Sequence, residues 1–270
     1  MRHLEFLDHP GPIPFAHRGG RGSWPENSWP AFENAVGLGY RYLETDVRAT
    51  SDGVVLLLHD ETLDRVTDST GPISSLTCRE AAGIRLRSPG NAHEPGTEAD
   101  QEIPRLDQLL DRWPDIRLNI DIKEPGAVAP TVDVIRRANA VSRVCVTSFR
   151  DATIRQVRSL LGENLCVGGG TRTVGSLRLQ SLLPAAAQRG RLRGRADVVQ
   201  VPTAFRGVPV CDARFVRCAT RLGVPVHAWT INDTDEMERL LDLGVQGLIT
   251  DYPEILKAHL VSRGQWWGSN

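Results

Sequence analysis

Short apolar runs alternate with longer stretches of helical periodicity along most of the chain. The short runs are typical of buried strands, and the longer stretches are typical of amphipathic helices. The strands predicted in this way cover residues 13–16, 42–47, 118–122, 144–149, 165–167, 198–201, 224–229 and 247–250. Helical patterns are clearest over 31–38, 128–138 and 153–161. Because strands and helices alternate, the pattern predicts a parallel sheet.

The number of strands favours a closed barrel over an open sheet. Eight strand–helix units follow one another without a break into a second domain, and no G-x-G-x-x-G motif follows the first strand. The predicted fold is therefore a TIM-type (β/α)8 barrel, a single domain over residues 1–270. Residues 69–105 are rich in Gly, Pro, Ser and acidic residues. We expect an insertion there, after the second strand and its hairpin, with a partly disordered loop over 87–101.

Composition narrows the class of partner. In a chain of 270 residues, 32 lysines and arginines balance 33 aspartates and glutamates, and no segment forms a tail of like charge. This balance argues against nucleic acid or an anionic membrane as the partner and favours a small molecule.

Cysteine usage and hydropathy bear on where the protein works. The five cysteines are an odd number without C-x-x-C spacing, which favours reduced thiols over a disulfide framework or a zinc site. The first residues lack the apolar run of a signal peptide, and no later run has the length of a membrane span. We therefore expect a cytoplasmic protein without stable membrane insertion. The sequence leaves its oligomeric state open.

Titratable residues gather where three of the predicted strands end. They are His17 and Arg18 after the first strand, Glu44 and Asp46 on the second, and Asp121 and Lys123 on the strand at 118–122. A barrel of this kind carries its chemistry at the C-terminal ends of its strands, and a core would not tolerate such groups unpaired. These positions are therefore candidates for a functional site.

Side-chain alternation places three carboxylates on the inner face of the barrel. Glu44 and Asp46 are two residues apart, so both side chains point to one face of the strand. Asp121 shares a face with Asn119 and Lys123 in the same way. Two carboxylates at this spacing repel each other unless a cation lies between them. The three acids form an oxygen-ligand set suited to a hard divalent cation, Mg²⁺ or Ca²⁺, with Mn²⁺ as a further candidate.

A hairpin is predicted directly after the second strand. Residues 52–53, Asp-Gly, are a strong signal for a two-residue turn. If Ser51 pairs with Val54, counting outward sets Asp46 opposite His59 on the same face of the ribbon. The hairpin would then return His59 to the level of the acids.

These positions together point to phosphate chemistry. A cation held by the three acids, with Arg18 and Lys123 beside it, would form a positively charged pocket that suits a phosphate group. His17 and His59 are then available as proton donor and acceptor. The arrangement predicts cleavage of a phosphoester.

Two further residues are candidates for substrate contacts. The segment 25–28, Pro-Glu-Asn-Ser, is typical of a helix N-terminus with Asn27 or Ser28 as its cap. Glu26 is the member of that segment expected to touch the site, by orienting Arg18 or a ligand hydroxyl. Trp229 ends a strand and is either barrel packing or a wall for the substrate.

The order and spacing of these motifs resemble the glycerophosphodiester phosphodiesterase family. Its hallmarks stand here as His17-Arg18-Gly19, Pro25-Glu26-Asn27-Ser28, Glu44-Thr45-Asp46, His59-Asp60, Asp121-Ile122-Lys123 and Trp229-Thr230-Ile231-Asn232, with G-L-I-T-D-Y-P near the end. Each motif alone is weak, but their joint order from about residue 13 to residue 256 is highly specific. The chain departs from the family pattern at Ser28, where threonine is usual, and at Asp121, where glutamate is usual.

The resemblance implies a TIM-type barrel, one divalent cation, and hydrolysis of glycerophosphodiesters to sn-glycerol 3-phosphate and an alcohol. Site roles carry over residue by residue: His17 and His59 as the catalytic acid and base, Glu44 and Asp46 as metal ligands, and Arg18 and Lys123 as phosphate contacts. Asp121 is shorter than the usual glutamate, which favours contact with the metal through a water molecule.

Other interpretations of the same residues remain open. Glu44 and Asp46 could form a structural ion-pair network with Arg41 or Arg48, and Asp121 with Lys123 could be a salt bridge alone. The substrate could be a lysophospholipid, with the insertion or 266–267, Trp-Trp, contacting the acyl chain. A rival of another class is a barrel that binds a phosphate ligand without catalysis.

Overall fold

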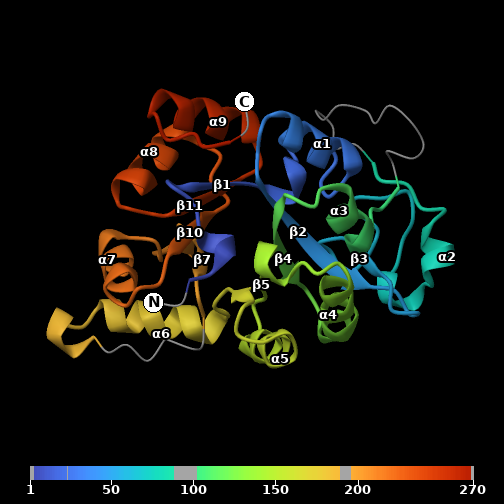
Figure 1. Cartoon of the computed structure of the whole chain (residues 1–270), viewed down its shortest axis with the longest axis horizontal. Coiled ribbons are helices and arrows are strands. Elements are labelled where there is room, and N and C mark those ends of the chain that lie inside the picture. The colour runs from blue at the N-terminus through green and yellow to red at the C-terminus, as the bar shows by residue number, and fades with distance from the viewer. Residues whose placement is uncertain (1–2, 23, 88–101, 189–195, 269–270) are drawn as a thin grey trace.

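Eight parallel strands form one sheet that curls around a central core (Figure 1). The computed structural model describes residues 3–22, 24–87, 102–188 and 196–268. The strands are β1 (Ile13–Ala16), β2 (Tyr42–Ala49), β4 (Arg117–Ile122), β5 (Val144–Thr147), β6 (Cys166–Val167), β7 (Val199–Pro202), β10 (Val226–Trp229) and β11 (Gly247–Thr250). Neighbours run in the order β6-β5-β4-β2-β1-β11-β10-β7. A parallel bridge between Gly168 and Val198 joins the edge strands β6 and β7, so the barrel closes.

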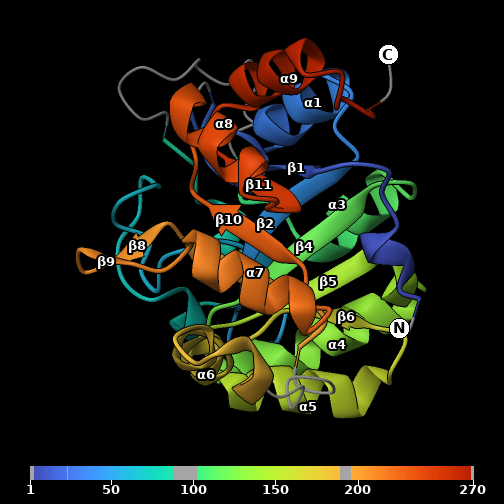
Figure 2. The same cartoon turned by 90° about the vertical axis from the view of Figure 1, so that its left-hand side faces the viewer.

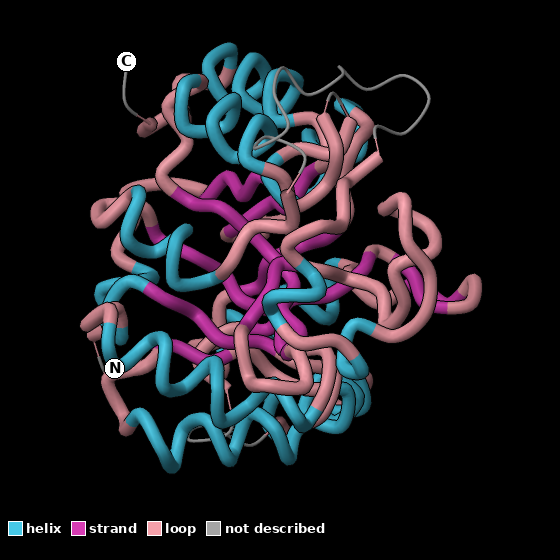
Figure 3. Tube along the Cα trace, turned by 90° about the vertical axis from the view of Figure 1, so that its right-hand side faces the viewer, coloured by secondary structure: helices cyan, strands magenta, loops and turns pink. Residues whose placement is uncertain are grey.

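Helices surround the sheet, as the tube in Figure 3 shows. The α-helices are α1 (Trp29–Gly37), α2 (Cys78–Ala81), α3 (Leu106–Arg112), α4 (Val128–Arg137), α5 (Asp151–Leu161), α6 (Thr171–Ser181), α7 (Ala213–Arg221), α8 (Thr234–Asp242) and α9 (Pro253–Ser262). Short 3-10 helices cover Glu5–Leu7, His17–Gly19, Ile73–Ser75, Pro125–Ala127, Val141–Arg143 and Ala185–Ala187. Within the described part of the chain, no helix is both long enough and apolar enough to cross a membrane.

The predicted TIM-type barrel is confirmed, and the eight predicted strands all form. The first and last strands have the predicted bounds, whereas β2 continues two residues further, to Ala49. The helix after β1 starts at Trp29 because Ser28 caps it: the Ser28 hydroxyl accepts the N–H of Ala31 at 3.3 Å. Pro30 in the first turn lacks an N–H where a helix has no partner for one.

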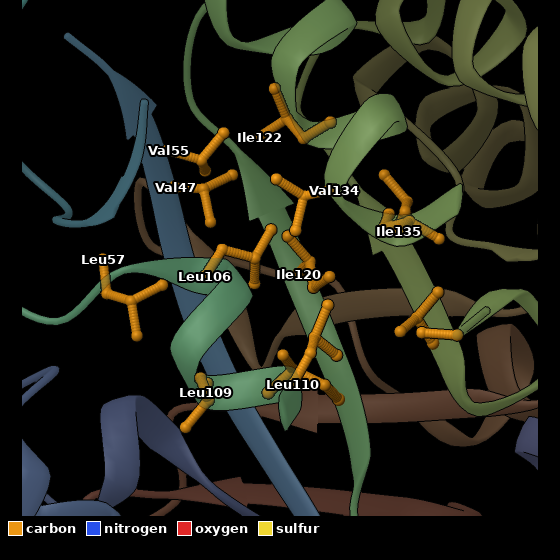
Figure 4. Packing of buried hydrophobic residues seen from close by; sticks show 14 of the residues in the cluster. Val47, Val55, Leu57, Leu106, Leu109, Leu110, Ile120, Ile122, Val134 and Ile135 are labelled. Carbon is orange, nitrogen blue, oxygen red and sulfur yellow. The ribbon is translucent and has the colours of Figure 1, made fainter. Parts of the chain in front are cut away.

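Apolar side chains fill the space between the sheet and its helices. On one side, Ile120 and Ile122 of β4 pack with Leu106 of α3 and with Val134 and Ile135 of α4 (Figure 4). All five are buried. This packing fixes β4 in the barrel with its other face, which carries Asn119 and Asp121, turned inward.

The N-terminal end of the barrel interior is closed by packed aromatic rings. Phe6, from the segment before β1, stacks on Phe15 and meets the edge of Tyr42. The Tyr42 hydroxyl donates to the carbonyl of Phe6 at 2.8 Å, so the buried hydroxyl is satisfied. These packed rings block the way into the barrel interior from this end.

The predicted hairpin forms, but its predicted register is wrong by one residue. Strand β3 (Val55–Leu57) pairs antiparallel with β2. The N–H of Leu58 donates to the carbonyl of Asp46 at 3.0 Å, so Leu58 rather than His59 lies across from Asp46. The loop has three residues rather than two because Gly53, with a φ of +80°, adopts the left-handed conformation that closes a longer turn.

The chain between β3 and α3 builds a small apolar core of its own. Its described members are Leu56, Leu58, Leu63, Val66, Ile73, Ala81, Ile84, Leu86 and Ile103. A capping box at Thr77 and Glu80 starts the short helix α2 inside this segment. Of the predicted loop over 87–101, every residue except the first lies outside the described residues.

A second hairpin, which the sequence pattern does not predict, follows β7. It consists of β8 (Ala204–Phe205) and β9 (Val208–Pro209) and projects from the barrel beside α7 (Figure 2). Arg206 and Gly207 form its turn, both with positive φ. Strands of two residues are too short to show alternation, which explains why the pattern misses them.

Candidate active site

The ring of His17 is held between the first and last strands of the barrel. His17 follows β1, and its neighbour in the sheet, β11, is followed by Asp251. His17 Nδ1 lies 2.6 Å from Asp251 Oδ1, and a carboxylate can only accept, so Nδ1 carries the proton. Asn232 holds Asp251 in turn, because its Nδ2 donates to Oδ2 at 2.9 Å. This leaves His17 Nε2 facing the interior, 3.8 Å from Glu44 Oε2.

A second histidine, which follows β3, is held in the same way. His59 Nδ1 lies 2.6 Å from Asp60 Oδ1, and Arg65 Nε donates to the other oxygen of Asp60 at 2.5 Å. The side chain of His59 is 36% exposed, whereas that of His17 is 13% exposed. Two histidines, each fixed through Nδ1 by a carboxylate, therefore stand at the C-terminal ends of the strands.

The two environments move the histidine pKa values in opposite directions. Burial alone would lower the pKa of His17, but the charges of Glu44 and Asp251 outweigh it and raise that pKa. Burial lowers the pKa of His59, and the charge of Asp46 only partly opposes this effect. A pair with pKa values pushed apart suits one acid and one base.

Two cations share the carboxylate of Asp46. Arg18 Nε lies 2.8 Å from Asp46 Oδ2, and Lys123 Nζ lies 2.7 Å from Oδ1. Lys123 also contacts Asp121 Oδ2 at 2.6 Å, so its ammonium bridges two carboxylates. Burial would raise the pKa of Asp46, but Lys123 and Arg18 outweigh it and lower that pKa. Asn27 adds a longer hydrogen bond to the same carboxylate, at 3.4 Å.

Glu26 links the surroundings of His17 to those of His59 through arginines. Arg65 binds it with two N–H groups, both at 2.8 Å, and Arg18 Nη1 donates to it at 2.8 Å. Arg21 reaches from Glu26, 3.7 Å away, to Asp251 at 3.4 Å. Burial would raise the pKa of Glu26, but its bonds to Arg65 and the charge of Arg18 lower it. Glu26 therefore contacts Arg18 directly, and its role in orienting Arg18 stays a prediction.

Two carboxyl groups in the site have raised pKa values. Glu44 is buried and accepts the backbone N–H of Arg18 at 3.0 Å, and burial with the repulsion of Asp46 raises the pKa of Glu44 to about 7. Burial also raises the pKa of Asp121, whose buried Oδ1 has no hydrogen-bond partner in the structure. Such groups would be stabilised by a further cation.

The predicted metal ligands are oxygen donors of the kind that hard cations prefer, but their side chains are not arranged as a coordination site. Among the described residues, no three His, Cys, Asp or Glu side chains converge as a metal-binding group. Lys123 stands between Asp46 and Asp121, where it already supplies positive charge. Two observations fit an added hard cation: the oxygen Asp121 Oδ1 has no hydrogen-bond partner, and the pKa of the Glu44 carboxyl is raised.

An aromatic wall flanks the mouth of the barrel. Trp229 ends β10 and meets Phe149 edge to face, with ring centroids 6.1 Å apart. Lys123 Nζ lies 5.7 Å from the centroid of the Phe149 ring, which places this wall next to the cations. Phe149 is 59% exposed, an unusual exposure for a phenylalanine.

Comparison with known proteins settles the family. Residues 17–255 match the model of the glycerophosphoryl diester phosphodiesterase family. The chain belongs to this family. It is 40% identical over 267 residues to the probable glycerophosphodiester phosphodiesterase 2 of Mycobacterium tuberculosis (strain ATCC 25618 / H37Rv), covering 98% of this chain and 97% of that protein. The chain is therefore a phosphoric diester hydrolase, as the sequence predicts.

Solved structures of the family share the fold. A putative glycerophosphoryl diester phosphodiesterase from Silicibacter pomeroyi DSS-3 superposes with a TM-score of 0.78 at 22% identity, over 98% of this chain and 100% of that one. An Oleispira antarctica phosphodiesterase, solved in complex with the product sn-glycerol-3-phosphate, gives a TM-score of 0.75 at 25% identity, over 93% and 97% of the two chains.

The predicted site residues of this family member do meet at one end of the barrel. The alternative partners for Glu44 and Asp46 do not form: Arg48 binds Glu124 at 2.8 Å instead. Asp121 and Lys123 do form the salt bridge that the sequence left open.

Trp266 and Trp267, the suggested acyl contacts, lie away from the site. Trp266 meets the edge of the buried Tyr40 ring, which precedes β2, with centroids 5.1 Å apart. Trp267 lies against Gly11, just before β1 begins. Both positions are at the N-terminal ends of strands, opposite the histidines.

The sequence reasoning missed the residues that hold the histidines. Asp251 directly follows a predicted strand, so the rule that selected Asp46 could have selected it as well. Asp60 was visible only as the neighbour of His59. No sequence pattern pointed to Arg65. Its partners Asp60 and Glu26 are far from each other in sequence, and only the fold brings both of them to Arg65.

Proposed function

We propose that this enzyme hydrolyses glycerophosphodiesters to sn-glycerol 3-phosphate and an alcohol, with His17 and His59 as its acid and base. The carrying observation is that each histidine is fixed through Nδ1 by a carboxylate at the same rim that presents Arg18 and Lys123. The product is supported by the Oleispira antarctica relative, whose complex contains sn-glycerol-3-phosphate.

Arg18 and Lys123 would bind the phosphate group. Both carry charge at every pH of interest, because Asp46 raises the pKa of each beyond the opposing effect of burial. A phosphate oxygen that approaches them takes the place of one Asp46 contact, so the cations need move little. Their charge then stabilises the negative charge that develops on the phosphoryl oxygens as the diester is attacked.

The histidines would carry the protons. With Nδ1–H committed to a carboxylate, each ring presents Nε2 to the substrate, as the fixed orientation of His17 illustrates. One ring removes the proton of the attacking hydroxyl, from water or from the glycerol of the substrate, and the other protonates the departing alcohol. Both dyads are needed, since two protons move in the reaction.

We also propose a divalent cation, Mg²⁺, Ca²⁺ or Mn²⁺, held by Glu44, Asp46 and Asp121. Support comes from the unpaired oxygen of Asp121 and from the pKa of Glu44, raised to about 7 by burial and by the repulsion of Asp46. When bound, such an ion supplies Lewis-acid stabilisation of phosphoryl oxygens. Glu44 must be ionised to hold it, so a bound cation and an ionised Glu44 stabilise each other.

We propose a water-soluble diester as the substrate. The tryptophans suggested as acyl contacts pack at the opposite end of the barrel. The wall formed by Phe149 and Trp229 lies beside Lys123 and is suited to cover the glycerol or headgroup. Turnover of lysophosphatidylcholine at a rate matching that of glycerophosphocholine would contradict this assignment.

The cytoplasm is the proposed location. Cys145 and Cys166 are register neighbours on β5 and β6, both buried, and both are free thiols. Adjacent free thiols are typical of a reducing compartment.

The first test is release of sn-glycerol 3-phosphate from glycerophosphocholine. EDTA-treated protein should be inactive, and Mg²⁺, Ca²⁺ or Mn²⁺ should restore turnover. His17→Ala and His59→Ala should each lower kcat by about 10²- to 10⁴-fold with any metal. His3→Ala is the matched control, because His3 is exposed and precedes β1, whereas His17 follows the other end of that strand. Full activity in EDTA would refute the metal, and full activity of either site variant would refute its role.

A further inference from the structure

An exposed apolar segment follows helix α6 on the outside of the barrel. Residues 182–187, Leu-Leu-Pro-Ala-Ala-Ala, are all exposed, and Leu179 one turn earlier is 69% exposed. Leu182 and Leu183 are 56% and 48% exposed. Single exposed apolar side chains are ordinary, but a contiguous patch of them marks an interaction surface.

Arginines border this segment along the neighbouring helix α7. Helices α6 and α7 lie side by side in the outer layer, as both views show (Figures 1 and 2). Helix α7 buries Phe215 and Val216 and turns Arg214, Arg217 and Arg221 to the solvent, where a hollow of about 350 Å³ separates them from the apolar segment.

Among the residues that the structure describes, no carboxylate forms an ion pair with these arginines. Arg221 bonds only the amide oxygen of Gln188, at 2.7 and 3.2 Å, and no described carboxylate pairs with Arg214 or Arg217. Neither 171–188 nor 213–223 contains an acidic residue, and Asp212, which caps α7, pairs with Arg178 at 2.9 Å. The segment 189–195 contains none either, so it cannot supply the missing charge.

We propose that this α6–α7 surface, residues 179–188 with Arg214, Arg217 and Arg221, docks the enzyme on an anionic lipid bilayer. Exposed alkyl side chains next to unpaired arginines are the features that recognise such a surface: the apolar groups enter the acyl boundary and the cations meet the lipid phosphates. The docking goes beyond the proposed function, since it concerns a face outside the active site.

Two other occupants fit the observations less well. A second copy of this chain that paired the same faces would bring arginine against arginine, with no carboxylate to relieve the repulsion. An acidic protein partner would need a carboxylate patch and an apolar patch matched in shape to this surface, whereas an anionic bilayer offers phosphates and acyl chains side by side without such matching.

The position of the surface leaves the active site open. Helix α7 packs on the side of the barrel, whereas the histidines lie at the C-terminal ends of the strands. Docking through α6 and α7 therefore holds the barrel beside the bilayer without covering its mouth. Diesters released from membrane lipids would then be generated close to the enzyme.

The test is co-sedimentation of the full chain with lipid vesicles. We expect binding to phosphatidylcholine vesicles that contain phosphatidylglycerol, a weak response to phosphatidylcholine alone, and a fall in binding as NaCl rises above about 0.1 M. Arg214→Gln with Arg217→Gln should lower the partition coefficient about 25-fold, about fivefold for each charge. Leu182→Ser with Leu183→Ser should weaken binding at both low and high salt.

A matched control removes two exposed arginines elsewhere on the outer layer. Arg137→Gln with Arg155→Gln, on α4 and α5, makes the same change in net charge and should leave the partition coefficient unchanged. All variants should melt like the wild type and keep its activity on glycerophosphocholine, and the vesicle assay reads binding even if the proposed reaction is wrong. The proposal would be overturned by equal binding to the two kinds of vesicle or by no binding to either. It would also be overturned if the control variant lost as much binding as the Arg214 and Arg217 variant, or if the wild type were a dimer that the Leu182 and Leu183 variant abolishes.

Discussion

Arg65 ties one histidine to the centre of the site, so its removal tests whether that link positions the histidine. Its guanidinium donates to Asp60 at 2.5 Å and to both oxygens of Glu26 at 2.8 Å. Asp60 in turn holds His59 at 2.6 Å. In Arg65→Ala, Glu26 keeps Arg18, but Asp60 loses the donor that fixes its second oxygen.

Arg65→Ala should lower the rate of catalysis more than the stability of the fold. The Arg65 side chain is 47% exposed, so its three charged bonds stabilise the fold by only about 1–2 kcal/mol after screening. A histidine that tilts by a fraction of an ångström loses about 10- to 100-fold in rate. We therefore expect kcat of Arg65→Ala to fall by about that factor with KM nearly unchanged, since Arg65 touches no phosphate.

The assay is steady-state release of sn-glycerol 3-phosphate, with the melting temperature of each variant recorded. Arg65→Lys should recover only part of the loss, because one ammonium cannot bridge two carboxylates as a guanidinium fork does. Added guanidinium should partly restore Arg65→Ala. Arg79→Ala, which removes an exposed arginine from the same segment, is the control. A kcat for Arg65→Ala equal to that of wild type would refute the positioning role.

Three further predictions follow from buried or titrating groups. Burial lowers the pKa of His227 to about 3, below its unfolded value near 6.5, so the unfolded chain takes up the proton first as the pH falls. The free energy of unfolding of the wild type should therefore fall by about 2 kcal/mol more than that of His227→Gln between pH 7 and pH 5. Urea denaturation measures this difference. In Gly247→Ala the new Cβ would lie 2.6 Å from the His227 ring, which should cost about 1–3 kcal/mol in thermal unfolding, and His227→Ala should relieve it. An activated p-nitrophenol leaving group should rescue the variant of whichever histidine, His17 or His59, is the acid, and rescue of both or neither would contradict the division of roles.

The fold and the inward-facing acids could be predicted because each depends on local periodicity. Alternation along β2 fixes that Glu44 and Asp46 share a face, whatever the rest of the chain does. Closure of eight strands then brings His17 to them. The hairpin register failed for a related reason: one residue of loop length decides which residue lies opposite Asp46, and both lengths are compatible with the Asp-Gly pair.

Local patterns do not show which residues pair to support the histidines, because most of these pairs form through tertiary contacts. Glu26 lies 39 positions from Arg65 in sequence, and Asp251 lies 234 positions from His17. The positions of the cations between the carboxylates also depend on tertiary contacts. The spacing of Glu44 and Asp46 requires a positive charge, but only the fold shows that Arg18 and Lys123 already supply part of it.

The proposed α6–α7 surface is compatible with a near-neutral chain, because a bilayer senses the charges of one face rather than the net charge. A net charge of −1 excludes a strong field around the whole molecule, and on that basis the sequence argued against an anionic membrane. Charges at physiological salt act over a screening length of about 8 Å, shorter than the width of the barrel. A bilayer that meets helix α7 therefore senses Arg214 and Arg217 and not the acids on the far side. Near-neutral composition and a cationic, apolar docking face are compatible, because the first is a sum over the chain and the second depends on which residues the fold places together.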